Sequence, residues 1–256
     1  MVLTFKICKM LNEFKIILHN GLQYIPKPKT AVVPPPFRGR PIITHQKVDE
    51  DKIMVLCPTS AISKNPFKID LGKCVFCGEC AFQFPEKISF TNDHRISSNV
   101  PEYLIIKEGE NSQITLNQSF IKKEIKKLFK KSLKLRQVSA GGDNSAEFEL
   151  NACGNANFDM GRYGIEFVAS PRHADGILVT GPITENMAEA LEIAYKAVPE
   201  PKILILCGTD AISGGIFADS KALNRNFLEK YKPDLYIAGN PPHPLTIING
   251  ILDLIT

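Results

Sequence analysis

Three cysteines spaced two residues apart, Cys74, Cys77 and Cys80, constrain this chain more than any other feature of its sequence. A fourth, Cys57, stands upstream and is followed by Pro58. The chain has seven cysteines, an odd number that no disulfide framework uses up. In a protein without a secretory signal, the C-x2-C-x2-C spacing is typical of metal binding. We therefore treat these four thiols as a candidate ligand set.

A ferredoxin-type scheme explains both the cysteines that are present and those that are missing. Two-cluster bacterial ferredoxins use the run C-x2-C-x2-C-x3-C-P twice, and the last cysteine of each run ligates the other run's cluster. By this scheme Cys57, Cys74, Cys77 and Cys80 form one complete set. The positions of the other set hold Lys47, Glu50, Ile53 and Phe84. Chance retention of four of the eight positions would leave a complete set about once in 35 times.

The sequence therefore predicts one 4Fe–4S cluster in an α+β ferredoxin-like module. A zinc site or four idle thiols are the alternatives, because zinc sites also use C-x2-C pairs. The Cys-Pro pair and the third closely spaced cysteine favour iron.

The distribution of proline, charge and apolar runs divides the chain into four parts. We predict an amphipathic arm with a proline-rich connector over 1–37, the ferredoxin-like module over 38–110, a basic linker helix over 111–136, and an α/β domain over 137–256.

The arm has apolar residues at helical spacing, among them Phe14, Ile17 and Leu18, and the helix should end near Asn20-Gly21. It either docks on a partner or a membrane surface, or packs on its own domain. Lysines interrupt its apolar residues, so we expect neither a secretory signal nor a spanning helix, but a cytoplasmic protein. Prolines between Pro26 and Pro36 predict an extended connector.

The stretch Ile121–Arg136 has eight basic residues and one acidic residue, a net charge of +7, whereas the whole chain carries +4. Its apolar residues Ile121, Ile125, Leu128, Phe129 and Leu133 fall on one helical stripe. Because no aromatic interleaving or nucleic-acid motif accompanies the lysines, we expect an acidic partner or anionic lipid rather than nucleic acid.

From residue 164 short apolar runs alternate with helical stretches, which predicts a doubly wound, mostly parallel flavodoxin-like sheet. The expected strands are Ile165–Ala169, Ile177–Thr180, Ile203–Cys207 and Leu235–Ala238. The expected helices are Glu185–Val198, Lys221–Tyr231 and Leu245–Ile255. The working loops of such a sheet lie at the carboxyl ends of its strands, here Gly181–Thr184, Gly208–Gly215 and Gly239–His243.

Several motifs in this half resemble one family. The stretches SPRHADGILVTGPITENM and AGNPPHP are similar to the small electron-transfer subunit of energy-converting nickel–iron hydrogenases and formate hydrogenlyase, a family that includes the B-type subunit of respiratory complex I. FRGRP at 37–41, before a ferredoxin module, resembles fused versions of that subunit. The resemblance implies two partners, a large-subunit homologue and the membrane subunits of an ion-translocating module. It also implies attachment to the inner face of the cell membrane through the complex.

The resemblance also implies a second cluster site, whose four cysteine positions fall here on Asp143, Ala146, Asp210 and Asn240. Alanine cannot be a ligand, and hard oxygen donors hold an iron–sulfide cage poorly, so we predict that this cluster is absent. Magnesium or calcium bound by the oxygen donors is the alternative to a polar loop cluster. Cys153 and Cys207 miss the ligand positions, and we expect both to be core thiols.

Two weaker patterns do not support other activities. The glycine-rich loop from Gly208 to Gly215 lacks the G-x-x-x-x-G-K-[ST] run of a nucleotide site. His173 has no nucleophile beside it in the sequence, so we do not expect it to act as a catalytic base.

Two functions remain. In the first, the chain is a scaffold arm of a membrane-associated complex and retains one structural 4Fe–4S cluster. In the second, that cluster passes single electrons to a large-subunit partner. Neither makes the chain catalytic by itself.

Overall fold

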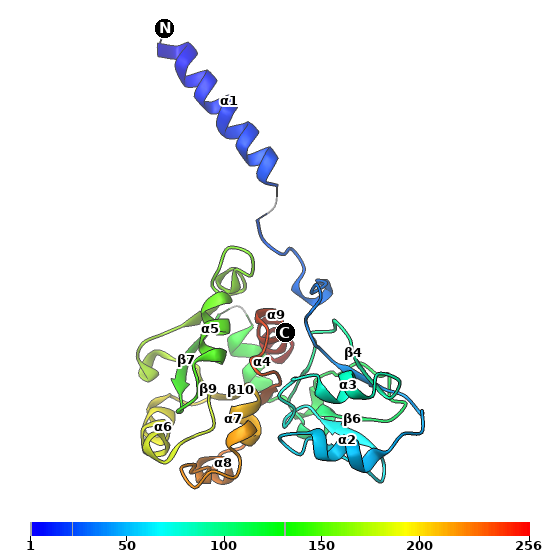
Figure 1. The fold of residues 1–256 in the computed structure, drawn as a ribbon. Helices are drawn as coiled ribbons and strands as arrows, with labels where there is room; N and C mark the ends of the chain where they lie inside the picture. The colour runs from blue at the N-terminus through cyan, green and yellow to red at the C-terminus, as the bar shows by residue number, and fades with distance from the viewer. Residues whose placement is uncertain (1, 22, 131) are drawn as a thin grey trace.

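The computed structural model describes residues 2–21, 23–130 and 132–256, and for residues 2–10 only the backbone. The N-terminal helix α1 (Val2–Asn20) extends away from a body of two packed modules (Figure 1). Its end agrees with the predicted end at Asn20-Gly21. Among the described residues, no helix combines the length and apolarity that a bilayer crossing needs.

A six-stranded sheet organises the C-terminal module, with the strand order β5-β11-β10-β9-β7-β8. All pairs are parallel except the antiparallel pair of β5 and β11. The strands are β5 (Ser97–Ser98), β7 (Leu133–Ser139), β8 (Ile165–Phe167), β9 (Gly176–Thr180), β10 (Ile203–Cys207) and β11 (Leu235–Ile237). Counted along the chain from β7, the parallel strands follow the flavodoxin-like order 2-1-3-4-5. The expectation of a doubly wound, mostly parallel sheet is confirmed.

Each face of this sheet has its own layer, because successive side chains of a strand point to opposite faces. Leu204 and Leu206 of β10 belong to one apolar cluster, whereas Ile205 and Cys207 belong to the other. Helices α6 (Glu185–Ala197), α7 (Thr209–Ser213) and α8 (Asn226–Lys230) contribute to the first cluster. Helices α4 (Lys123–Phe129), α5 (Ser145–Ala152) and α9 (Pro244–Ile255) contribute to the second.

The N-terminal module contains two small antiparallel sheets, β1-β4 and β2-β3-β6. Its strands are β1 (Pro41–Ile43), β2 (Ile62–Ser63), β3 (Lys68–Asp70), β4 (Ile88–Phe90) and β6 (Ile105–Lys107), and its helices are α2 (Glu50–Leu56) and α3 (Glu79–Gln83). Asp49 is the N-cap of α2, since its carboxylate accepts a hydrogen bond from the backbone N–H of Lys52.

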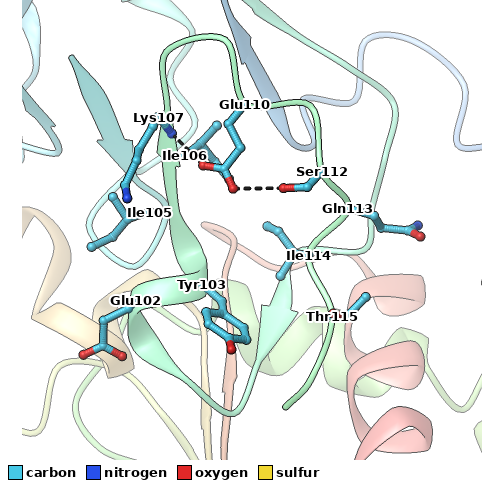
Figure 2. A pocket seen from close by; sticks show the side chains of 10 residues that line it. All are labelled: Glu102, Tyr103, Ile105, Ile106, Lys107, Glu110, Ser112, Gln113, Ile114 and Thr115. Atoms are coloured by element: carbon cyan, nitrogen blue, oxygen red, sulfur yellow. Dashed lines mark hydrogen bonds between the residues drawn. The ribbon is translucent and has the colours of Figure 1, made fainter. Parts of the chain in front are cut away.

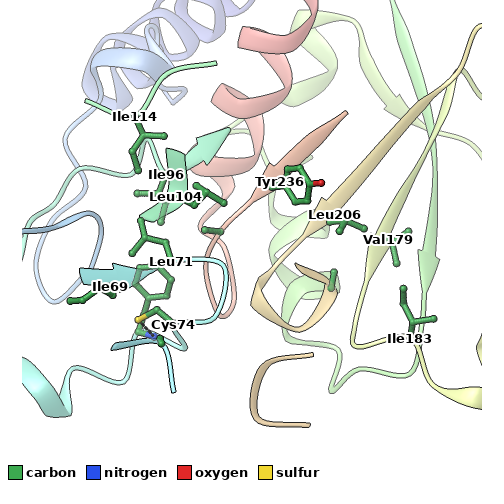
Figure 3. Close-up of a cluster of buried hydrophobic side chains, with 14 of the residues drawn as sticks. Ile69, Leu71, Cys74, Ile96, Leu104, Ile114, Val179, Ile183, Leu206 and Tyr236 are labelled. Carbon is green, nitrogen blue, oxygen red and sulfur yellow. Dashed lines mark hydrogen bonds between the residues drawn. The ribbon is translucent and has the colours of Figure 1, made fainter. Parts of the chain in front are cut away.

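The two modules share one core. Strand β5 lies within residues 38–110 in sequence but forms the edge of the C-terminal sheet, where Ser97 and Ser98 pair with Ile237 and Tyr236. A single buried cluster accordingly runs from Ile69 and Leu71 to Val179 and Leu206 (Figure 3). The sequence boundary at residue 110 does not separate two independent cores.

The predicted basic helix over 121–136 is wrong in its second half. Helix α4 ends at Phe129, and Leu133 begins β7, the strand between β8 and β9. Leu133 and Leu135 are fully buried while Lys134 between them is exposed, so this stretch follows the strand period of two. The helical stripe also fails at Leu128, which is exposed.

Two further segments differ from expectation. The predicted helix Lys221–Tyr231 is shortened to α8, because Ala222 and Asn224 bond to the backbone of Glu185 and Ile183 instead. The proline-rich segment is not extended throughout: it turns in the 3₁₀ helix η1 (Pro28–Thr30), and Pro28 and Val33 are buried on the body. Short 3₁₀ helices complete the described chain: η1 (Pro28–Thr30), η2 (Pro101–Leu104), η3 (Gln118–Phe120), η4 (Met160–Tyr163), η5 (Pro171–His173) and η6 (Gly215–Phe217).

Candidate metal centre

The four predicted cysteine ligands line one small cavity of about 20 Å³. Cys57 follows the last residue of α2, Cys74 and Cys77 lie in the loop before α3, and Cys80 lies in the first turn of α3. All four are free thiols. The rest of the lining is mainly apolar and includes Ile62, Ile69, Val75 and Phe90. Two segments far apart in sequence therefore bring the complete ligand set together.

The backbone around the cavity curls so that amide groups point at sulfur. The N–H of Phe76 donates to Cys74 Sγ at 3.3 Å, and the N–H of Ala61 donates to Cys57 Sγ at 3.2 Å. This curl needs left-handed backbone at Phe76, with φ +51°, and at Gly78, with φ +81°. At Gly78 a Cβ would also lie 3.1 Å from Arg38 Cδ, so glycine suits both the conformation and the space.

Burial raises the pKa of Cys74 to about 12 and that of Cys80 to about 11. For Cys74 the hydrogen bond from Phe76 opposes the shift, while the neighbouring thiols add to it. Four converging thiolates in an apolar cavity would repel one another, so the thiolate form needs cationic metal to compensate. Four soft donors with amide N–H groups aimed at sulfur are the donor set that an iron–sulfur cluster requires.

In the described part of the chain, no three His, Cys, Asp or Glu side chains meet closely enough to hold a single metal ion. A cubane distributes its four thiolates over four irons, so its ligands surround a cage rather than a point.

The positions of the other ferredoxin-type ligand set hold side chains in different surroundings. Ile53 is fully buried, Phe84 packs on the same core, and Lys47 is exposed. Glu50 instead lies 3.8 Å from the ammonium of Lys87.

Lys87 itself is only 1% exposed. Its ammonium donates to Glu108 at 2.6 Å and lies 4.9 Å from the centre of the Phe67 ring. A buried cation paired with carboxylates thus lies beside Glu50, one of these four positions.

The four positions aligned with the family's second cluster also come together. Asp143, Ala146, Asp210 and Asn240 line one cavity of about 10 Å³ at the carboxyl ends of β7, β10 and β11. Glu147 and Cys207 also line this cavity, and no sequence motif placed them there. Glu147 follows Ala146 on α5 and accepts a hydrogen bond from Thr180 at 2.6 Å. The two expected core thiols are fully buried: Cys207 ends β10, and Cys153 follows α5.

Asp210 is the chemically unusual member of this second cavity. Its Oδ1 is buried and has no hydrogen-bond partner among the described residues. Burial raises the pKa of Asp210 to about 6; Asp143 and Glu147 add to the shift, and the guanidinium of Arg225 opposes it. Arg225 donates to the carbonyls of Pro182, Asp210, Ala211 and Ile212, and so holds the surrounding loops together.

A buried threonine joins the two cavities. The hydroxyl of Thr209, at the start of α7, donates to the carbonyl oxygen of Cys74 at 2.8 Å and lies 3.2 Å from that of Gly239. The loop that carries Cys74 and Cys77 is therefore bonded directly to helix α7, which carries Asp210.

Other hollows lie elsewhere on the molecule. A cavity of about 510 Å³ is lined by β6 and residues 110–115, where Glu110 accepts hydrogen bonds from Ser112 and from the backbone of Lys107 (Figure 2). Another, of about 190 Å³, lies between Phe37, Phe76 and the loop Gly239–His243. His173 is exposed on η5, and its neighbour Asp175 bonds to the backbone of Lys134. We find no nucleophile paired with His173 among the described residues.

The match to a known protein family lies in the second module. Residues 144–254 match the family described as NADH ubiquinone oxidoreductase, 20 Kd subunit. An uncharacterized Methanocaldococcus jannaschii protein is 42% identical over 50% of this chain and 86% of its own length. The probable membrane-bound hydrogenase subunit mbhJ of Pyrococcus furiosus is 35% identical over 45% of this chain and 69% of its own length.

Two further relatives extend this set. The B-type subunit of NADH-quinone oxidoreductase from Heliobacterium modesticaldum is 42% identical over 41% of this chain and 61% of its own length. A chain of an archaeal respiratory membrane complex, the membrane-bound sulfane sulfur reductase, is 32% identical over 49% of this chain and 70% of that chain, with a TM-score of 0.44.

Proposed function

The chain belongs to the family of the 20 kDa subunit of NADH–ubiquinone oxidoreductase, and from that premise we propose that it is an iron–sulfur subunit of a membrane-associated complex related to complex I and energy-converting hydrogenases. In this proposal it is a scaffold arm with one 4Fe–4S cluster. The observation that carries it is the contrast between two cavities. One is lined by four thiols, whereas the other has carboxylate, methyl and amide groups where the family's ligands are expected.

The first cavity supports a resident cluster in a ferredoxin-like module. Cys57, Cys74, Cys77 and Cys80 would hold it. When bound, a 4Fe–4S cluster exchanges single electrons and cross-links the segments that ligate it. The amide groups of Ala61 and Phe76 donate to sulfur and stabilise the thiolate form, which also tunes the potential of such a cluster.

The second cavity supports the scaffold function. Asp143, Asp210 and Asn240 offer oxygen atoms, which are poor ligands for an iron–sulfide cage. An electron on the cluster at the four-cysteine site would then have no second cluster to pass to, although the family resemblance implies one. What the second module offers in this proposal is its folded surface, for contact with a large-subunit homologue and with membrane subunits on the inner face of the membrane.

Electron transfer is the second candidate, and one observation favours it. Cys77 is exposed, so one edge of the proposed cluster reaches the protein surface. A cluster at the surface can exchange electrons with a docked donor or acceptor directly. In that case the chain passes single electrons to its large-subunit partner through the one cluster.

Metal analysis of anaerobically purified protein tests the cluster. We expect about four irons and four labile sulfides per chain. Cys77→Ala should lose most of this iron, because the exposed Cys77 has little packing role and acts only as a ligand. Cys153→Ala is the matched control: it also removes a thiol, but one buried away from the cavity, and should keep the iron. About eight irons per chain, or equal iron in the two variants, would contradict the assignment.

A redox titration distinguishes the two functions. A cluster that stays in one oxidation state with both chemical donors and a co-purified large-subunit partner supports the scaffold. One that the partner reduces or oxidises at a rate comparable to the turnover of the complex supports electron transfer.

A further inference from the structure

Helix α1 presents apolar side chains to solvent. Every side chain from Leu11 to Asn20 is exposed, with Phe14 at 63% and Leu18 at 76%. Leu11, Phe14 and Leu18 are spaced three and four residues apart, so they share one side of the helix. The whole helix stands clear of the body (Figure 1). A stripe of this kind loses free energy in water and gains it against an apolar surface.

The segment after α1 is fixed to the body, so the helix leaves from a defined place. The N–H of Ile25 donates to the carbonyl of Asn157 at 2.8 Å, and Arg162 donates to the carbonyl of Ile25 at 2.7 Å. The carbonyl of Pro28, three residues after Ile25, accepts a hydrogen bond at 3.0 Å from Asn249 of α9. Lys29 forms an ion pair with Asp253, also on α9.

The same helix α9 supports the most basic part of the chain. Both η1, which follows α1, and α4 pack against α9, whose twelve residues span about 18 Å. Lys122, Lys123, Lys127 and Lys130 are exposed at or next to α4, with Glu124 as their acidic neighbour. The exposed apolar side chains of Phe120 and Leu128 stand among these lysines.

We propose that α1 and the lysines of α4 together form a docking surface for anionic lipid headgroups. The helix would lie in the plane of the interface, with Leu11, Phe14, Ile17 and Leu18 in the acyl boundary. The charge distribution on α1 and α4 favours a lipid surface over an acidic groove on a protein as the docking partner. Helix α1 has three lysines and one glutamate in its sequence, the stretch 121–136 carries +7, and both present apolar groups between the cations. This pattern matches a surface that is anionic outside and apolar beneath.

The proposal does not depend on the cluster, so its test is separate from the metal analysis. Full-length protein is sedimented with vesicles of neutral phosphatidylcholine, or of phosphatidylcholine with phosphatidylglycerol. We expect binding to the anionic vesicles to be at least about tenfold tighter, and to weaken as salt is added.

Variants assign the binding to the two elements. The double variant Phe14→Glu/Leu18→Glu should lose nearly all binding, and Lys123→Glu/Lys127→Glu should weaken it roughly tenfold. Ile193→Glu/Ile216→Glu is the control: it places the same two charges on similarly exposed apolar residues of α6 and η6, outside α1 and α4. Its binding should equal that of the wild type. Circular dichroism and thermal unfolding of each variant verify that the body remains folded.

Three results would overturn the proposal. They are wild-type protein that ignores anionic vesicles, equal affinity for neutral and anionic vesicles, and undiminished binding by the double glutamate variant of α1. Failure to bind vesicles together with capture of α1 by a protein subunit of the complex would assign the helix to a protein partner instead.

Discussion

Asp210 occupies a position where the family resemblance implies a cysteine, and it carries an energetic cost there. Its buried Oδ1 lacks a hydrogen-bond partner in the part of the chain that the structure describes, and burial beside Asp143 and Glu147 raises its pKa from 3.8 to about 6. The folded state therefore binds the proton more tightly than the unfolded chain does. Its contribution to stability is fully present below pH 4 and is lost as the pH rises through about 6.

We expect Asp210→Asn to stabilise the protein at neutral pH. The amide is neutral at every pH, so it avoids burying a charge, and the gain should be on the order of 2 kcal/mol at pH 7.5. The gain should disappear near pH 4, where the wild-type carboxyl is protonated. Urea unfolding of both proteins between pH 4 and pH 8 measures this difference. Asp219→Asn, at an exposed aspartate, is the control and should change little at any pH. A gain that does not vary with pH would disprove the argument.

At the residue scale, the sequence predicted which thiols meet better than it predicted what surrounds them. That the four cysteines line one cavity could be anticipated from their spacing and the ligation scheme, because ligand chemistry permits few residue types. Glu147 and Lys87 could not, since their roles depend on burial. A carboxylate or ammonium looks the same in sequence whether it is solvated or placed against Asp210 or Phe67. Glu147 had one usable signal: it follows a lost ligand position on the same helix.

At the element scale, Arg225 holds the loops around the second cavity in place. Its guanidinium donates to carbonyls in the loop after β9 and in the short helix α7. Most of these carbonyls belong to a five-residue helix, whose last turn has few hydrogen bonds of its own. The planar fork of an arginine is needed to reach several acceptors at once.

Replacing Arg225 by lysine keeps the charge but removes this fork. We expect Arg225→Lys to lower the free energy of unfolding by about 2 kcal/mol, because partly buried carbonyls lose their donors. Thermal unfolding followed by circular dichroism measures the loss. Arg172→Lys makes the same substitution at an exposed arginine, and should lie within about 0.5 kcal/mol of wild type. Similar stability of the two variants would show that the fork contributes nothing.

Element boundaries followed from the sequence where one period dominated. The buried run of β10 and the helix α9 were predicted nearly to the residue, because β10 is apolar throughout and α9 is apolar at most of its positions. The stretch 121–136 failed because Leu133 satisfies both the helical stripe and the alternation of β7. Only pairing with β8 and β9 decides between them. That pairing involves residues about 30 to 40 positions away along the chain, which no local pattern records.

At the scale of the whole molecule, the two modules are joined by β5. Its two residues complete the C-terminal sheet, and α9 packs against them closely. Ser97 and Ser98 are polar and belong to no alternating apolar pattern, so nothing in the local sequence indicated that they form a strand. The consequence is mechanical: the cysteine-bearing module cannot move as a rigid body without breaking the sheet edge and the bond between Thr209 and Cys74. A shared core predicts that the modules unfold together.

Gly250 offers a test of this joint. It lies in the middle of α9, where a Cβ would come within 2.7 Å of Ser97 Oγ and 2.8 Å of Ser97 Cβ. Since the serine side chain is short and buried, β5 itself must shift to accept Gly250→Ala. The steric cost should exceed the helix-propensity gain of about 1 kcal/mol. We expect the melting temperature to fall by about 3–6 °C.

Hydrogen exchange measured peptide by peptide shows whether that loss is shared. Peptides from β4, in the N-terminal module, and from β10, in the sheet, should lose protection together. The reason is that β5 is part of the N-terminal module in sequence and part of the C-terminal sheet in structure. Gly161→Ala is the control, since a Cβ there meets nothing within 4 Å. If Gly250→Ala weakened only the sheet and left β4 protected, the modules would be separate folding units. The cysteine-bearing module would then be tethered to the family's domain rather than built into it, and the scaffold function would lose its rigid joint.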